Sequence, residues 1–291
     1  MAQLCNKASS IENGSKSGRI SNVKEQWKAR QHFDHLATEY DHYRTLDEAP
    51  ISFLIQSVSG TEQSICELGS GTGRYLIPLV KAFQSSAVVV KEAYGIDISP
   101  RMLETAKQQM DGLKPSIKWA LASADNTGLP TESMSLVTSF NSIHHLPIRE
   151  TLAEAERILI PGGYFAIYIR VLDQESEHIW GRWFPGYLDY SQVPTREFMT
   201  NLGNYNRGFE LLHAQDFTFE RKTTFSRICE QTEHKYYSTL DRYPHKEFHN
   251  AYSEFLGNIR ANYNDLDEIT FHSSYSLFLY QLSSKIRGET A

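Results

Sequence analysis

The chain has only three cysteines among its 291 residues, Cys5, Cys66 and Cys229. Three thiols so far apart provide neither a disulfide framework nor a metal knuckle, and they suit a reducing cytoplasm. No run of about 18 apolar residues is present, so a membrane-spanning helix is not expected. The N-terminal residues also lack the apolar core of a signal peptide. We therefore expect a cytoplasmic protein with no membrane partner.

Basic residues are fewer than acidic ones: the chain has 29 Lys and Arg residues and 35 Asp and Glu residues, which gives a net charge of -6. A protein that follows a phosphate backbone is usually basic, so we expect no nucleic-acid partner. Residues 1–20 are polar and predict a disordered leader. We expect a core over residues 21–171, with residues 172–291 completing the same domain, in a monomer or a homodimer.

Three glycines on alternate positions follow a short apolar run. Ile65-Cys66-Glu67-Leu68 predicts a buried strand, and Gly69, Gly71 and Gly73 come directly after it. Apolar residues at helical spacing then begin at Tyr75. Glycines allow positive φ and let a ligand lie against the main chain, while a helix start offers free N–H groups. This stretch therefore predicts a cofactor site.

The loop does not match two better-known nucleotide motifs. A dinucleotide fingerprint needs a third glycine where this chain has Arg74, and a P-loop ends in a lysine that is missing here. Strands that alternate with helices every 20 to 30 residues or so indicate a doubly wound, mostly parallel α/β sheet.

Two further strand ends carry side chains suited to a nucleoside. The second strand is expected to end at Asp97, with Ser99 capping a helix in which Met102 lies one turn further on. A carboxylate there can bind ribose hydroxyls, and a methionine can pack on an adenine face. The alternative is that Asp97 is a plain turn residue. Asp125 and Asn126 follow the third strand, where they could hydrogen-bond a purine edge.

Five motifs then occur in a familiar order, and they are Glu67 to Gly73, Gly95 to Ser99, Ala124-Asp125 with Leu129-Pro130, His144-His145-Leu146, and Arg157 to Gly163. The series resembles class I S-adenosylmethionine-dependent methyltransferases, in the branch similar to ubiquinone and menaquinone C-methyltransferases. The resemblance covers roughly residues 30–171 and argues against a dehydrogenase or a nucleotide kinase. It implies a Rossmann-like, seven-stranded sheet with an antiparallel last strand, and helical and aromatic insertions that form a lid.

The resemblance also implies S-adenosylmethionine as the cofactor and assigns its contacts. The three glycines would hold the methionine part, with Glu67 near its ammonium group. The remaining cofactor residues would be Asp97, Ile98, Met102, Asp125, Asn126 and Asn141. The transfer requires no metal. His245 and His249, four residues apart on an expected helix, are better explained as a solvated face.

Residues expected to contact the acceptor are less well defined. Asn141 would lie beside the sulfonium and the substrate, and His145 would orient or deprotonate the substrate. Tyr40 would belong to a flap over the cofactor, although an amphipathic helix covering the sheet edge explains it almost equally well. The remaining candidates are His144, Arg170, Trp180, Trp183 and Tyr187. Packing of an inserted loop on the core explains the aromatic cluster as well as a pocket wall does.

These patterns predict a methyltransferase acting on a nitrogen or oxygen of a specialised metabolite. The sixteen tyrosines and the acidic balance favour an amine, which cation–π contacts would hold. Three alternatives are a C-methyltransferase of a quinone-like or aromatic metabolite, an RNA or protein methyltransferase, and a protein that binds S-adenosylmethionine without turnover.

Overall fold

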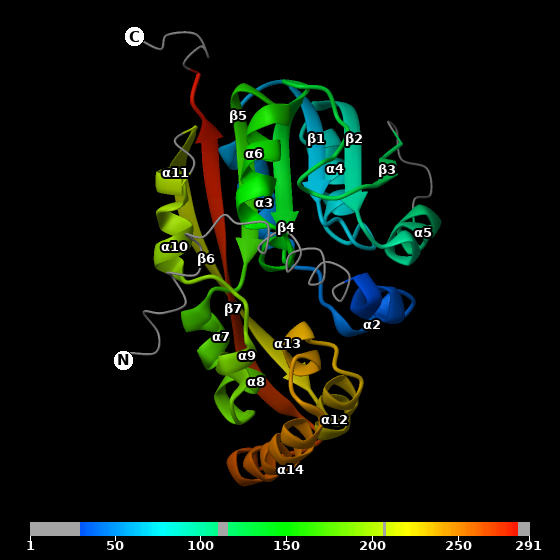
Figure 1. Ribbon diagram of the computed structural model, residues 1–291, viewed down its shortest axis with the longest axis vertical. Helices are drawn as coiled ribbons and strands as arrows, with labels where there is room; N and C mark the ends of the chain where they lie inside the picture. Colours follow the sequence, from blue (N-terminus) through cyan, green and yellow to red (C-terminus); the bar gives the residue numbers. More distant parts are fainter. Residues whose placement is uncertain (1–29, 110–115, 206–207, 285–291) are drawn as a thin grey trace, which may run out of the picture.

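A seven-stranded sheet forms the centre of the molecule in the computed structural model, which describes residues 30–109, 116–205 and 208–284 (Figure 1). The strand order is β3-β2-β1-β4-β5-β7-β6. The expected leader, residues 1–20, lies outside the described residues. The strands are β1 Glu62–Leu68, β2 Val89–Asp97, β3 Lys118–Leu121, β4 Met134–Phe140, β5 Leu159–Ile169, β6 Phe209–Thr223 and β7 Ile269–Leu282.

Strand direction confirms the predicted architecture. Strands β1 to β5 pair in parallel, and β7 is antiparallel to both of its neighbours, β5 and β6. Strand β2 begins at Val89, which pairs with Glu62 of β1, and ends at Asp97 as expected. The change of strand order between β1 and β4 is a topological switch point, where α/β sheets bind ligands at the carboxyl ends of the strands.

Helices cover both faces of the sheet. Helices α3 Ala49–Ser57 and α4 Leu76–Ser85 pack on one face, where Leu54, Leu76 and Ile65 share a core cluster. Helix α6 Ile148–Ile158 packs on the other face with α10 Arg196–Thr200 and α11 Leu202–Tyr205. Successive strand residues point to opposite faces, so Ile65 enters the first cluster and Cys66 the second. Helix α5 Pro100–Gln108 lies against β2 and β3.

Strands β6 and β7 extend well past the carboxyl edge of the parallel strands, and a group of helices surrounds this extension (Figure 1). They are α7 Leu172–Glu177, α8 Ile179–Trp183, α9 Tyr187–Tyr190, α12 Phe225–Glu233, α13 Ser238–Asp241 and α14 His245–Asn262. A third apolar cluster, which includes Trp180, Phe184 and Phe255, holds them together. No helix in the described ranges is both long enough and apolar enough to cross a bilayer.

Trp119 on β3 makes two glycines necessary for packing. A Cβ added to Gly95 would lie 2.3 Å from Trp119 Cε3, and one added to Gly73 would lie 2.5 Å from Trp119 Cη2. We expect Gly95→Ala to lower the free energy of unfolding by about 1–3 kcal/mol, because it overpacks this contact. Chemical denaturation would measure the change.

Gly257→Ala on α14 is the matched control. A Cβ at Gly257 meets nothing within 4 Å, and alanine favours a helix interior, so this variant should be as stable as the parent or more so. Equal stability of Gly95→Ala and the parent protein would contradict the packing role.

Candidate functional site

The glycine turn between β1 and α4 is held open by its backbone conformation. Gly69, Gly71 and Gly73 have φ values of 70°, 54° and 78°. A Cβ on Gly69 would lie 2.6 Å from Ser142 Cβ, whereas one on Gly71 would meet nothing within 4 Å. Position 69 therefore requires glycine because Ser142 lies so close, whereas the absence of a side chain at Gly71 leaves free space in front of the turn.

Asp97 joins the end of β2 to this turn. Its Oδ2 accepts a hydrogen bond from the Gly71 N–H at 2.8 Å, and its Oδ1 accepts one from the Ser99 N–H at 2.8 Å. The Ser99 side chain in turn accepts a bond from the Met102 N–H, so Ser99 caps α5. The carboxylate is thus a fixed element of the site rather than a plain turn residue.

A cavity of about 80 Å³ lies in front of the turn, and we call it the loop cavity. Among the residues expected at the cofactor, its wall includes Glu67, Gly69, Gly71, Asp97, Ile98, Met102 and Asn141. Gly73, Asp125 and Asn126 are not in this wall. Gly73 makes room for Trp119, Asp125 accepts a hydrogen bond from Ser123, and Asn126 is exposed.

Glu67 is buried in the wall of the loop cavity, with an exposed fraction of 2%. Its Oε2 has no hydrogen-bond partner within the described residues. Burial raises the pKa of this carboxyl well above its ordinary value, and Asp97 adds to the rise. A ligand ammonium group would restore the charge and supply the absent donor.

Asn141 lies at the junction of β4 with the loop that follows. It has a φ of 54°, and its N–H donates to the Tyr168 carbonyl at 2.7 Å. Asparagine tolerates this left-handed region better than most residues, and such outliers concentrate at functional sites. The conformation holds Asn141 at the carboxyl edge of the sheet, where it was expected.

The segment 30–43 covers the loop cavity. Residues 30–36 are helical, α2 is Tyr40–Tyr43, and both Phe33 and Tyr40 line the cavity. Asp41 fixes the segment by accepting hydrogen bonds from Thr72 Oγ1 at 2.8 Å and from Gln109 Nε2 at 2.7 Å. This segment occupies the place expected of a flap.

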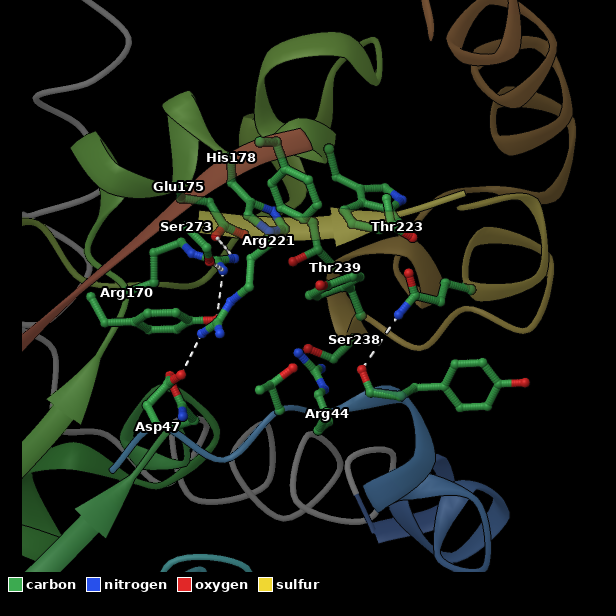
Figure 2. Close-up of a pocket in the computed structure, with 18 of the residues that line it drawn as sticks. Arg44, Asp47, Arg170, Glu175, His178, Arg221, Thr223, Ser238, Thr239 and Ser273 are labelled. Carbon is green, nitrogen blue, oxygen red and sulfur yellow. Dashed lines mark hydrogen bonds and ion pairs between the residues drawn. The ribbon is translucent and has the colours of Figure 1, made fainter. Parts of the chain in front are cut away.

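A second cavity, of about 460 Å³, adjoins the first, and we call it the hairpin cavity. Its wall comes from the segment after α2, the carboxyl edge of the sheet, the β6–β7 extension and the helices around it (Figure 2). Its volume is within the usual range for small-molecule pockets. Six residues line both cavities: Phe33, Tyr40, Arg74, Tyr75, Asn141 and His145.

Arginines dominate the inner wall of the hairpin cavity. Arg170 pairs with Glu175 at 2.9 Å and also donates to Ser273 Oγ and Tyr275 Oη. Arg221, from β6, reaches across the cavity to Asp47 (Figure 2). The candidate Arg170 is therefore anchored in the cavity wall by several partners.

Three histidines of the same wall carry no charge at neutral pH. Burial lowers the pKa of His144 to about 3 and that of His145 well below its ordinary value, and neighbouring arginines lower both further. Burial also lowers the pKa of His178 well below its ordinary value, and Arg170 makes the next largest contribution. His145 lines both cavities, whereas His144 and His178 line the hairpin cavity. An uncharged imidazole at the junction is in the form that can accept a proton.

The expected aromatic residues divide between the two explanations considered for them. Trp180 and Tyr187 line the hairpin cavity and also belong to the third apolar cluster. Trp183 is absent from the wall of either cavity, and its side chain packs beside that cluster with Arg182 over its ring.

Four residues of the site belong to no motif in the sequence, and they are Arg44, Asp47, Arg221 and Tyr275. They come from segments far apart in the chain, and no spacing rule connects them.

Comparison with known proteins identifies this arrangement. Residues 66–167 match the family described as a methyltransferase domain. This part of the chain is similar to class I S-adenosylmethionine-dependent methyltransferases. The cofactor of this superfamily is S-adenosylmethionine, and the loop cavity suits it, with an unpartnered buried carboxylate at Glu67 and free space in front of Gly71.

One relative and two structures show how far the similarity extends. Aklanonic acid methyltransferase DauC of a Streptomyces species is 30% identical over 141 residues, which are 47% of this chain and 62% of that protein. The chain spans between 4% and 62% of the length of the curated relatives that it matches.

The YcgJ protein of Bacillus subtilis has a TM-score of 0.56 at 15% identity, over 82% of this chain and all (100%) of that one. The 4+2 cyclase SpnF has a TM-score of 0.51 at 15% identity, over 82% of this chain and 81% of that one. At such identities these two likenesses concern the fold alone.

The neutral buried histidines make stability depend on pH. Their pKa values are lowered in the folded state, so the unfolded chain binds more protons below the ordinary value of about 6.5. The free energy of unfolding should be highest above that value, and it should fall as the pH drops toward the lowered pKa. One such imidazole contributes about 1.4 kcal/mol of this loss per pH unit.

We expect His144→Gln to reduce the loss of unfolding free energy between pH 7 and pH 5 relative to the parent. Denaturant titration at both pH values would measure it. His234→Gln, at an exposed histidine of α12's C-terminal end, is the matched control and should leave the slope unchanged. Equal slopes in His144→Gln and the parent would contradict the assignment.

Proposed function

We propose that this chain transfers a methyl group from S-adenosylmethionine to an oxygen or nitrogen of a small molecule held in the hairpin cavity. The observation that carries the proposal is the set of six residues shared by the two cavities, which brings a donor site and an acceptor site into contact. When bound, S-adenosylmethionine supplies an electrophilic methyl group on sulfur. Holding the two reactants in line then supplies much of the catalysis.

The residues of the loop cavity have distinct roles in this proposal. Glu67 accepts hydrogen bonds from the cofactor's ammonium group, and Asp97 accepts them from its ribose hydroxyls. Ile98 and Met102 provide the apolar surface for adenine. Asp125 and Asn126 stand outside this wall, so we leave them without a role in cofactor binding.

The charges of the hairpin cavity favour an oxygen over a nitrogen as the acceptor atom. The tyrosine content and the acidic balance of the chain favoured an amine, but the cavity wall carries six Arg and Lys side chains against four carboxylates, and an ammonium group would meet this excess of positive charge. We therefore propose an oxygen nucleophile. A specialised metabolite suits this pocket, and the relative DauC takes its name from an acid, aklanonic acid.

His145 is the residue that we propose as general base. It lies at the junction of the cavities, its Nδ1 has no hydrogen-bond partner among the described residues, and its ring makes an edge-to-face contact with Phe33 at 5.1 Å. Tyr40 and Phe33 close the same junction and exclude water there. Asn141, which also lines both cavities, positions the acceptor.

A protein that binds the cofactor without methyl transfer is the second candidate. The cyclase SpnF has a similar fold and is named for a reaction other than methyl transfer. The fold therefore does not by itself require methyl transfer. A nucleic-acid acceptor fits poorly with the net charge of -6.

Cofactor binding is the first test. We expect calorimetry to show that Asp97→Ala weakens binding of S-adenosylmethionine and S-adenosylhomocysteine by about 10- to 100-fold, because hydrogen bonds to a charged group are lost. Glu104→Gln, at an exposed acid of α5 outside both cavities, should bind like the parent. Absence of binding to the folded parent protein would overturn the proposal.

Turnover is the second test. Methyl incorporation from labelled S-adenosylmethionine into hydroxylated small molecules should identify an acceptor. With that acceptor, His145→Gln should lower kcat by about 10²- to 10⁴-fold, the usual contribution of a general base, while affinity for S-adenosylhomocysteine stays the same. An unchanged kcat would remove His145 from this role, and tight cofactor binding with no methylated product would favour the second candidate.

A further inference from the structure

Arg44 carries a positive charge that no carboxylate balances within the described residues. Its Nη2 donates to the Tyr236 carbonyl at 3.0 Å, and its guanidinium lies 4.4 Å from the centre of the Tyr237 ring. The buried Nε of Arg44 has no hydrogen-bond partner. A guanidinium stays protonated in proteins, and an enclosed charge without a counter-ion is costly.

Most other cations of the cavity have a carboxylate partner. Arg170 is paired with Glu175, Arg221 with Asp47, and Lys222 with Glu268. Arg227 donates to the His42 carbonyl instead. The wall carries six Arg and Lys side chains against the four carboxylates of Asp47, Glu175, Asp267 and Glu268, so it is net positive.

The histidines of this wall support the same conclusion. Arg44, Arg170 and Arg242 each contribute to lowering the pKa of His144, and Arg44 contributes to the same shift at His178. A positive potential disfavours protonation of an imidazole, so these rings neither cancel nor add to the charge of Arg44 at neutral pH.

Arg44 also has the right position to contact an acceptor. It follows α2 directly and lines the hairpin cavity. Figure 2 shows its side chain rising from the N-terminal segment into the open space, with Ser238 nearby and with Arg221 and Asp47 across the cavity. A ligand that fills the hairpin cavity can therefore contact Arg44 and, at its other end, the residues shared with the loop cavity.

We propose that the acceptor carries an oxyanion, a carboxylate or a phosphate, and that Arg44 binds it. This inference rests on the proposed function and specifies the acceptor's chemical class. A planar guanidinium can offer two parallel N–H groups to the two oxygens of such a group. The anion supplies the counter-charge that the chain itself does not provide.

Fluorine NMR on protein loaded with S-adenosylhomocysteine can test this with probes that differ in charge. The probes are para-fluorobenzoate, its uncharged amide para-fluorobenzamide, and para-fluorophenyl phosphate. We expect the benzoate or the phosphate to bind at least about 10-fold more tightly than the amide, as expected for hydrogen bonds to charged groups. The stronger of the two anionic probes identifies which oxyanion the site prefers.

Variants assign the effect to Arg44. Arg44→Gln should bring the affinity for the anionic probes down to that for the amide, and Arg44→Lys should retain part of the preference. Arg182→Gln is the matched control, because Arg182 is an exposed cation on α8 outside both cavities. It should behave like the parent.

The outcomes separate this inference from the proposed function. Equal affinity for anionic and neutral probes in the parent protein would overturn the inference, whatever the stability of the variants. A preference that survives in Arg44→Gln would also overturn the role of Arg44. If S-adenosylhomocysteine itself does not bind, the proposed function fails, and the probe comparison is then made on the unloaded protein.

Discussion

The ion pair between Asp47 and Arg221 joins the two parts from which the hairpin cavity is built. Asp47 lies between α2 and α3, Arg221 lies on the part of β6 that extends past the sheet, and the two are 174 positions apart. Tyr168 Oη donates a further hydrogen bond to Asp47 at 3.0 Å. Removing one member of a buried pair leaves an unpaired charge, which costs about 3–5 kcal/mol. The shape of the cavity therefore depends on this contact.

Local chemistry explains what could be predicted from the sequence. The glycine turn, the acid at Asp97 and the Ser99 cap each depend on residues close together in the chain, and all three are found where they were expected. The antiparallel last strand was expected from resemblance to a known family, and β7 is antiparallel to both β5 and β6.

Contacts between distant segments explain what could not be predicted. Arg44 meets Tyr236, and Asp47 meets Arg221, through packing of helices and strands that no spacing in the chain connects. Asp125 and Asn126 follow β3 as expected, but neither lines the loop cavity. A bridge between Ser123 and Asn126 closes the local turn there.

The place of Phe33 and Tyr40 in both cavities has a consequence for the timing of turnover. The loop cavity, at about 80 Å³, is smaller than the roughly 300 Å³ at which ligand pockets usually begin, and Phe33 and Tyr40 form its cover. That cover is also a wall of the hairpin cavity. In the proposed function, a single movement of the segment held by Asp41 would therefore open both cavities. It would link release of the spent cofactor to release of the methylated product.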